Sequence, residues 1–140
     1  MSRIQSKPAQ VTIDGQTYYA TPAAITSTML GIEDHGVMSF SIACKGDGWG
    51  VSVGGYVLDT VPAERTAGSK RRPSVACGAL IAEMLDVFGV SSWEKLPHLR
   101  CHVLNESENA WGTQSAGIAN ADLSRAIVLR PFFAALCGES

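Results

Sequence analysis

A single stretch of the chain, residues 74–89, has the periodicity of a long helix. Its apolar residues recur at intervals of three and four, as on one buried helical face. They are Cys77, Leu80, Ile81, Met84, Leu85 and Phe88, with Glu83 and Asp86 off the stripe. Ser74 can cap the start of the helix, and Gly89 is a typical residue just beyond its end. We therefore predict one long helix that packs by one face against the rest of the protein.

Alternating sequences before this helix predict an antiparallel β-meander. Residues 37–44 alternate between apolar and small polar side chains, and residues 49–58 resume the alternation after a glycine-containing turn. Such alternation is typical of strands with one buried face. Residues 25–30, rich in Thr and Ile, are a third strand candidate. The Gly54-Gly55 pair inside the last strand indicates either a β-bulge or a close approach of the backbone.

The N-terminal residues are predicted to form an appendage to this sheet. Residues 11–19 have the pattern of a small hairpin with a type I′ turn at Asp14-Gly15. Thr21-Pro22 is expected to break the hairpin off. A chain of 140 residues is most simply one domain. We predict an N-terminal extension with a hairpin over residues 1–20 and a single ligand-binding domain over residues 21–140.

The segment that follows the long helix predicts a second, short helix and another strand. Ser91 and Glu94 have the spacing of a capping box, and Pro97 is expected to end the helix that they begin. Residues 98–104 alternate again and predict a strand.

The C-terminal third is harder to assign. Residues 105–120 are rich in Asn, Gly, Ser and Gln and predict a loop around Trp111, while residues 123–129 suit either a strand or a helix that Pro131 interrupts. Strands, helices and more strands follow one another without regular β-α alternation. This order predicts the α+β class, with an antiparallel sheet packed against one long and one short helix.

The charges of the chain are unevenly placed. The formal net charge is -2, which argues against a general nucleic-acid-binding surface. Residues 64–72 nevertheless sum to +3 and place Lys70, Arg71 and Arg72 directly before the long helix. A single basic spot suits a small anionic ligand, and the free N–H groups of a helix start strengthen such a site. The alternative is a core helix preceded by a solvated basic loop.

The cellular compartment of the protein and the redox state of its cysteines are predicted from motifs that the sequence does not contain. No stretch is long and apolar enough to cross a membrane, and the polar residues 1–10 have no signal-peptide core, so we expect a cytosolic protein. The four cysteines include no C-x-x-C pair. We expect all four to be reduced, with Cys44, Cys77 and Cys101 on core faces.

Catalytic motifs are weak. Glu33, Asp34 and His35 have the side chains of a metal or acid–base site, but consecutive strand residues point to opposite faces and cannot converge on one ion. His98 and His102 would share a strand face, which we expect to be the solvent side. The sequence has neither a G-x-S-x-G elbow nor a G-x-x-x-x-G-K-[ST] loop. We therefore predict no catalytic residue, no metal and no cofactor.

A nucleotide-like ligand has better support. The candidate binding residues are Arg71, Arg72, Asn105, Trp111, Arg125 and Arg130. The first two could hold phosphate at the helix start through bidentate contacts, and the last two could reach the same ligand from the C-terminal region. The tryptophan could stack on a base whose edge the asparagine recognises. The alternative for each is ordinary, because a lone Trp often packs internally and scattered arginines are often solvated.

Three segments resemble one known family. They are Met29-Leu-Gly-Ile-Glu-Asp-His-Gly-Val-Met-Ser-Phe40, Gly54-Gly-Tyr-Val-Leu-Asp59 and Val90-Ser-Ser-Trp-Glu-Lys-Leu96. In order and spacing they resemble the Thoeris anti-defence sponge of the first type, a phage family. The resemblance covers roughly residues 25–104, and its first two motifs are the specific ones.

This resemblance implies a protein that is not an enzyme. Members of the family bind cyclic ADP-ribose isomers, such as glycocyclic ADP-ribose, made by a host TIR-domain protein, and withhold them from the defence effector. They form dimers that can assemble into hexamers, and some also hold cyclic oligonucleotides at a separate site. Their ligand pocket uses arginines before the helix and near the C-terminus, with an aromatic residue and an Asn between them.

The nearest counterparts here are the six candidates named above. The resemblance implies a homodimer or hexamer in the cytoplasm of the infected bacterial host, with no DNA, RNA or membrane as partner. Pyrophosphate would sit at Arg71 and Arg72, with adenine on Trp111 and its edge at Asn105. Two alternatives remain: a nucleotide-hydrolysing enzyme that uses Glu33, Asp34 or His35, and a structural phage protein without a ligand.

Overall fold

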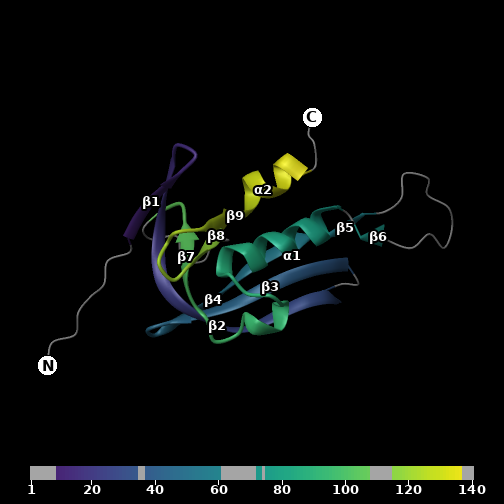
Figure 1. The fold of residues 1–140 in the computed structure, drawn as a ribbon, viewed down its shortest axis with the longest axis horizontal. Helices are drawn as coiled ribbons and strands as arrows, with labels where there is room; N and C mark the ends of the chain where they lie inside the picture. Colours follow the sequence, from purple (N-terminus) through teal and green to yellow (C-terminus); the bar gives the residue numbers. More distant parts are fainter. Residues whose placement is uncertain (1–8, 35–36, 61–71, 74, 108–114, 137–140) are drawn as a thin grey trace, which may run out of the picture.

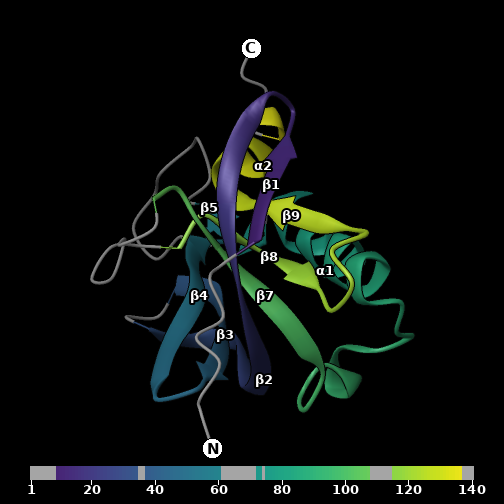
Figure 2. The same cartoon turned by 90° about the vertical axis from the view of Figure 1, so that its left-hand side faces the viewer.

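A computed structural model describes residues 9–34, 37–60, 72–73, 75–107 and 115–136. Its elements are β1 (Ala9–Ile13), β2 (Gln16–Asp34), β3 (Val37–Gly46), β4 (Trp49–Val57), β5 (Asp59–Thr60), β6 (Arg72–Pro73), α1 (Val75–Phe88), the 3₁₀ turn η1 (Trp93–Lys95), β7 (Arg100–Asn105), β8 (Gly117–Asn120), β9 (Ala126–Val128) and α2 (Leu129–Leu136). One antiparallel sheet has the order β4-β3-β2-β7-β8-β9, with β1 added to β2. Helix α1 lies across one face of it, and α2 projects from the same end as the β1–β2 hairpin (Figures 1 and 2). The predicted α+β class is confirmed.

Strand β2 joins all parts of the sheet. It pairs with β1 over residues 16–20, with β7 over residues 19–24 and with β3 over residues 24–34. The type I′ turn is confirmed, since Asp14 and Gly15 both have positive φ. The prediction that Thr21-Pro22 ends the hairpin is wrong, because β2 continues through both residues. Pro22 lies where β1 has ended and β3 has not begun, so one side of β2 has no described partner strand there, and a sheet edge tolerates proline.

The predicted meander is confirmed as β2, β3 and β4. Ser41 pairs with Gly54 and Ser39 with Val57, so β4 carries one extra residue, as the Gly54-Gly55 pair predicted. Both glycines have positive φ, at 131° and 86°. This bulge changes the direction of the strand just before Tyr56.

Helix α1 agrees with its prediction in position and partly in its buried face. Gly89 has a φ of +65°, its N–H donates to the Asp86 carbonyl, and the Val90 N–H donates to the Leu85 carbonyl. These two bonds form a Schellman motif. The buried residues are Ala76, Leu80, Met84 and Val87. Four other residues of the predicted face are only half-buried: Cys77, Ile81, Leu85 and Phe88. Ala76 and Val87 are buried in their place, so the buried face is rotated from the predicted one. Ser74 lies outside the described residues.

The predicted capping box does not form. Only the single turn η1 follows, and its N-cap is Ser92, which makes no capping bond through its side chain. Ser91 instead accepts a hydrogen bond from Lys95 Nζ at 2.8 Å. The indole N–H of Trp93 donates to Thr28 Oγ1 of β2 at 3.0 Å, which docks the turn on the sheet.

The short helix of the fold is α2, at the C-terminal end of the described chain. It includes Pro131 in its first turn, where the ring removes no helical hydrogen bond, so this proline does not interrupt the element. Residues 126–128 are strand β9, and β8 lies inside the segment predicted as a loop over 105–120. No helix among the described residues is both long and apolar enough to span a bilayer.

The core has two parts. The larger lies between the sheet, α1 and α2, and the smaller packs Tyr18 and Ala20 of the hairpin on β7 and β8. Cys44 and Cys101 are buried free thiols with their Sγ atoms 3.9 Å apart. Cys77 is also free and packs against the core as predicted, but it is only half-buried. The hydrogen bond with Cys44 and burial raise the pKa of the Cys101 thiol, so it stays protonated. Cys137 lies outside the described residues.

Candidate functional site

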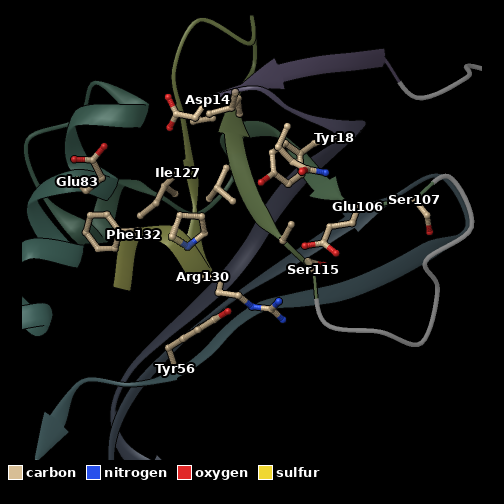
Figure 3. Close-up of a pocket in the computed structure, with 16 residues that line it drawn as sticks. Asp14, Tyr18, Tyr56, Glu83, Glu106, Ser107, Ser115, Ile127, Arg130 and Phe132 are labelled. Atoms are coloured by element: carbon tan, nitrogen blue, oxygen red, sulfur yellow. The ribbon is translucent and has the colours of Figure 1, made fainter. Parts of the chain in front are cut away.

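A cavity of about 1130 Å³ opens at the end of the sheet from which the β1–β2 hairpin and α2 project. Residues of β1, β2, β4, α1, the end of β7, β9 and α2 line it, so segments far apart in the sequence meet there. Figure 3 shows side chains from these elements around the opening. This volume is at the upper end of small-ligand pockets, which measure roughly 300–1000 Å³. A ligand as large as a dinucleotide would fit.

One wall of the cavity is aromatic. Tyr56 stacks on Phe133, with ring centroids 4.8 Å apart and planes at 18°, and Phe132 meets the same ring edge-on at 5.2 Å. Tyr56 and Phe132 both line the cavity. Because Phe133 is buried beneath them, both rings are held in place and offer apolar faces to a ligand.

A second wall is polar and acidic. Tyr18 is 5% exposed, and burial, then the charges of Glu106 and Asp14, raise the pKa of its hydroxyl. Both carboxylates line the cavity with it, as does Ser115, also 5% exposed. Within the described part of the chain, neither the Tyr18 nor the Ser115 side chain makes a hydrogen bond. Buried hydroxyls are normally hydrogen-bonded, so both are suited to bind a ligand or water.

The cavity has one described basic side chain, Arg130, from the first turn of α2. It makes no ion pair or hydrogen bond with any residue that the structure describes, and it lies beside Tyr56 in Figure 3. Glu83 of α1 is the third carboxylate of the lining. The described lining therefore contains three carboxylates and one guanidinium group, and its formal charge is negative.

The predicted binding residues are only partly brought together. Arg130 lines the cavity, and Asn105, half-buried at the end of β7, directly precedes the lining residues Glu106 and Ser107. Arg71 and Trp111 lie outside the described residues. The backbone of Arg72 pairs with Thr60, and its side chain is not described.

Arg125 lies elsewhere. Its guanidinium group pairs with the Asp86 carboxylate on α1, with both side chains more than half exposed, and it does not line the cavity. An exposed pair of this kind contributes only about 0–1 kcal/mol.

Nearby, the side-chain amide of Asn120 donates to the Val87 carbonyl at 3.2 Å, which fastens the β8–β9 turn to the helix. Hydrogen bonds from the hydroxyl and the N–H of Ser124 lower the pKa of Asp122 in the same turn.

Sequence analysis missed the aromatic and acidic lining. Tyr56 directly follows the two bulge glycines, a pattern that often re-aims a side chain near a site. Tyr18 belongs to a hairpin that was predicted as a separate appendage, so its contact with β7 and β8 was not anticipated. Phe132 follows Pro131, which was predicted to interrupt the element that in fact carries it.

The side chains of the polar cluster at Glu33, Asp34 and His35 lie outside what the structure describes. His98 is exposed and has a φ of +77°, whereas the ring of His102 is half-buried and lies 3.1 Å from the Asn120 carbonyl oxygen. Among the described residues, no three His, Cys, Asp or Glu side chains are grouped so that they could hold a metal ion.

No protein-family model, curated protein or solved structure matches this chain. The resemblance over residues 25–104 therefore stays a prediction. Any conclusion about function depends on the size, shape and charge of the cavity.

We predict that Tyr18 makes the protein less stable at alkaline pH. Because its folded-state pKa is raised, its contribution is fully present below the unfolded value of 10.0 and is lost as pH rises through the folded value. Urea unfolding at a series of pH values should show a steeper alkaline loss for the wild type than for Tyr18→Phe. Tyr19→Phe is the matched control and should keep the wild-type slope. Equal slopes for wild type and Tyr18→Phe would contradict the prediction.

Proposed function

We propose that this protein is a non-enzymatic sponge that binds and sequesters a cyclic ADP-ribose-type nucleotide, glycocyclic isomers included. The observation that carries the proposal is the cavity, large enough for a dinucleotide, with a stacked aromatic wall and with Arg130, which pairs with no residue that the structure describes. On the resemblance described above, it would act as a phage anti-defence protein in the cytoplasm of the infected host.

The chemistry of the lining suits such a ligand. An adenine base can stack on Tyr56 or Phe132, a contact worth about 1–3 kcal/mol. Arg130 can form charge-assisted hydrogen bonds to a phosphate. Sequestration requires the sponge to outcompete the effector, and nanomolar binding corresponds to about -12 kcal/mol. A pre-formed pocket reduces the cost of binding, which favours reaching that affinity.

Binding without cleavage is proposed on the resemblance described above. The described lining contains no His or Cys, but its carboxylates could act as a general base, so cleavage has to be tested. Incubation of the protein with cyclic ADP-ribose, followed by heat denaturation and mass analysis of the released molecule, tests this directly. Intact ligand supports a sponge. A linear product would instead support the hydrolase that uses Glu33, Asp34 or His35.

The proposal extends to the assembly. A homodimer, or a hexamer built from it, would follow from the resemblance, and a second site would hold a cyclic oligonucleotide. Light scattering measures the oligomeric state. Calorimetry with cyclic oligonucleotides in the presence of saturating cyclic ADP-ribose tests the second site, because binding at a separate site would persist.

We expect cyclic ADP-ribose isomers to stabilise the protein against thermal unfolding. At 100 times its dissociation constant a ligand adds about 2.7 kcal/mol. Arg130→Ala should weaken binding roughly 10- to 100-fold, because a hydrogen bond to a charged group contributes about 1.5–3 kcal/mol. Arg100→Ala, at an exposed position outside the cavity, is the matched control.

A parallel Arg71→Ala/Arg72→Ala variant tests whether the basic segment before α1 takes part. Loss of the thermal shift in that variant but not in Arg130→Ala would place the phosphate outside the cavity. A flat response of the wild type to every cyclic nucleotide would contradict the proposed function and favour a structural protein.

A further inference from the structure

The charge of the cavity does not match a purely anionic ligand. Among the described residues, Asp14, Glu83 and Glu106 line it together with one basic side chain, Arg130. A nucleotide with only neutral bases and several phosphates would meet repulsion from these carboxylates wherever it did not contact the arginine. The ligand that suits this wall carries a positive charge as well as a phosphate.

The acidic corner has a second feature that points to a ligand. Tyr18, 5% exposed as a residue, lines the cavity together with Asp14 and Glu106, and the charges of both carboxylates raise the pKa of its hydroxyl. Ser115 adds a second buried hydroxyl, and neither side chain has a hydrogen-bond partner in the described part of the chain. The two carboxylates can only accept hydrogen bonds, whereas the two hydroxyls can donate as well as accept, so the corner carries negative charge and has no cationic group of its own among the described residues. The Tyr18 ring adds a face that attracts cations.

We propose that the corner formed by Asp14, Tyr18, Glu106 and Ser115 binds a positively charged nucleobase, alkylated at a ring nitrogen, while Arg130 binds the phosphate of the same ligand. This inference rests on the proposed function and narrows its ligand class. In cyclic ADP-ribose the ring closes through a nitrogen of adenine, which leaves the base cationic at neutral pH. In glycocyclic isomers the two riboses are joined and adenine stays neutral. The cavity therefore favours the first kind of isomer.

Three mononucleotides separate base charge from size. 1-Methyladenosine 5′-monophosphate has a cationic base at neutral pH, N6-methyladenosine 5′-monophosphate has a neutral base with the same added methyl group, and adenosine 5′-monophosphate has neither. Isothermal titration calorimetry should give at least about tenfold tighter binding for the 1-methyl compound than for the other two. A tenfold ratio corresponds to about 1.4 kcal/mol.

The variants assign that preference to the corner. Asp14→Asn/Glu106→Gln removes two charges at exposed positions and keeps the side-chain shapes, so the fold should be retained, which thermal unfolding checks. Its preference for the 1-methyl compound should fall to within about twofold. Glu94→Gln, an exposed position outside the cavity, should keep the wild-type preference.

The outcomes distinguish this inference from the proposed function. Equal affinities for the three mononucleotides, or no binding of the 1-methyl compound, in a protein that binds cyclic ADP-ribose overturns the inference alone. A preference that survives in Asp14→Asn/Glu106→Gln also overturns it. Failure of every cyclic nucleotide and all three mononucleotides to bind overturns both.

Discussion

Replacement of Gly117 by Ala should destabilise the protein by about 3 kcal/mol, the upper end of the cost of overpacking. Gly117 pairs with Val128 across the β8–β9 ladder. A Cβ atom at this position would overlap the carbonyl oxygen of Ile127 and lie 3.0 Å from the Val128 Cα. These are backbone atoms of the neighbouring strand, so no side-chain rotation can relieve the overlap. The two strands would have to separate.

The same substitution should also weaken ligand binding. Ser115 and Ala116 precede Gly117, and Ile127 and Val128 lie opposite; all four line the cavity. Separation of β8 from β9 would therefore move two sides of the site and displace α2, which follows β9 directly. Calorimetry with cyclic ADP-ribose should show weaker binding for Gly117→Ala even at temperatures where the variant is folded.

Gly78→Ala is the matched control for Gly117→Ala. Gly78 lies on the exposed side of α1, with no atom within 4 Å of the Cβ position. Alanine is favoured over glycine inside a helix by about 0.8–1 kcal/mol, so this variant should be more stable than the wild type. Urea denaturation should give a lower free energy of unfolding for Gly117→Ala, and a higher one for Gly78→Ala, than for the wild type. If Gly117→Ala has the same free energy of unfolding as the wild type, β8 and β9 are not packed as described.

The elements that could be predicted from sequence depend on contacts close along the chain. Helix α1 and the β3–β4 hairpin were found because a 3.6-residue or two-residue period reports directly which side is buried. The Gly54-Gly55 bulge and the Gly89 helix end follow from local backbone conformation, which these glycines reveal.

The failures depend on contacts distant along the chain. Pro22 was predicted to end a strand, but its effect depends on which sides of β2 have partners, and those strands lie elsewhere in the sequence. Pro131 was predicted to interrupt an element, whereas in the first turn of α2 it is compatible with a helix. The capping box at Ser91 has the right local pattern, yet docking of Trp93 on Thr28 accompanies a single turn instead.

The cavity could not be predicted from the sequence, because its lining also depends on contacts between segments distant along the chain. Its walls come from segments far apart in the chain, and among the described lining residues only Arg130 was predicted from sequence as a binding residue, as a cation near an apolar run. The expectation drawn from the basic cluster at 64–72 stays a prediction, because these side chains lie outside the described residues, and the acidic corner is a separate feature. A site that combines Arg130 with Asp14 and Glu106 suits a dipolar ligand, whereas the charge of the loop alone suggested a simple anion.

Replacement of Gly54 by Ala should also cost about 3 kcal/mol or more. Its φ of +131° is rarely adopted by residues with a side chain, which adds strain of about 1–3 kcal/mol. A Cβ atom would lie 2.6 Å from the Phe40 carbonyl oxygen and 3.0 Å from the ring of that buried residue. The overlap lowers the stability by an amount similar to the strain, because the oxygen belongs to the backbone of the neighbouring strand β3 and cannot move aside alone.

The consequence for the site follows from the position of the bulge. Gly54 and Gly55 set the direction of the chain just before Tyr56, whose ring stacks on Phe133 and faces the cavity. If the bulge relaxes, Tyr56 loses this orientation, and binding of cyclic ADP-ribose should weaken roughly 10-fold, in line with loss of one stacking contact. Gly31→Ala, in β2 with open space around its Cβ position, should change neither stability by more than about 0.5 kcal/mol nor affinity. If Gly54→Ala instead binds the nucleotide as tightly as Gly31→Ala while losing stability, the aromatic wall does not contact the base, and the ligand is held by Arg130 and the acidic corner.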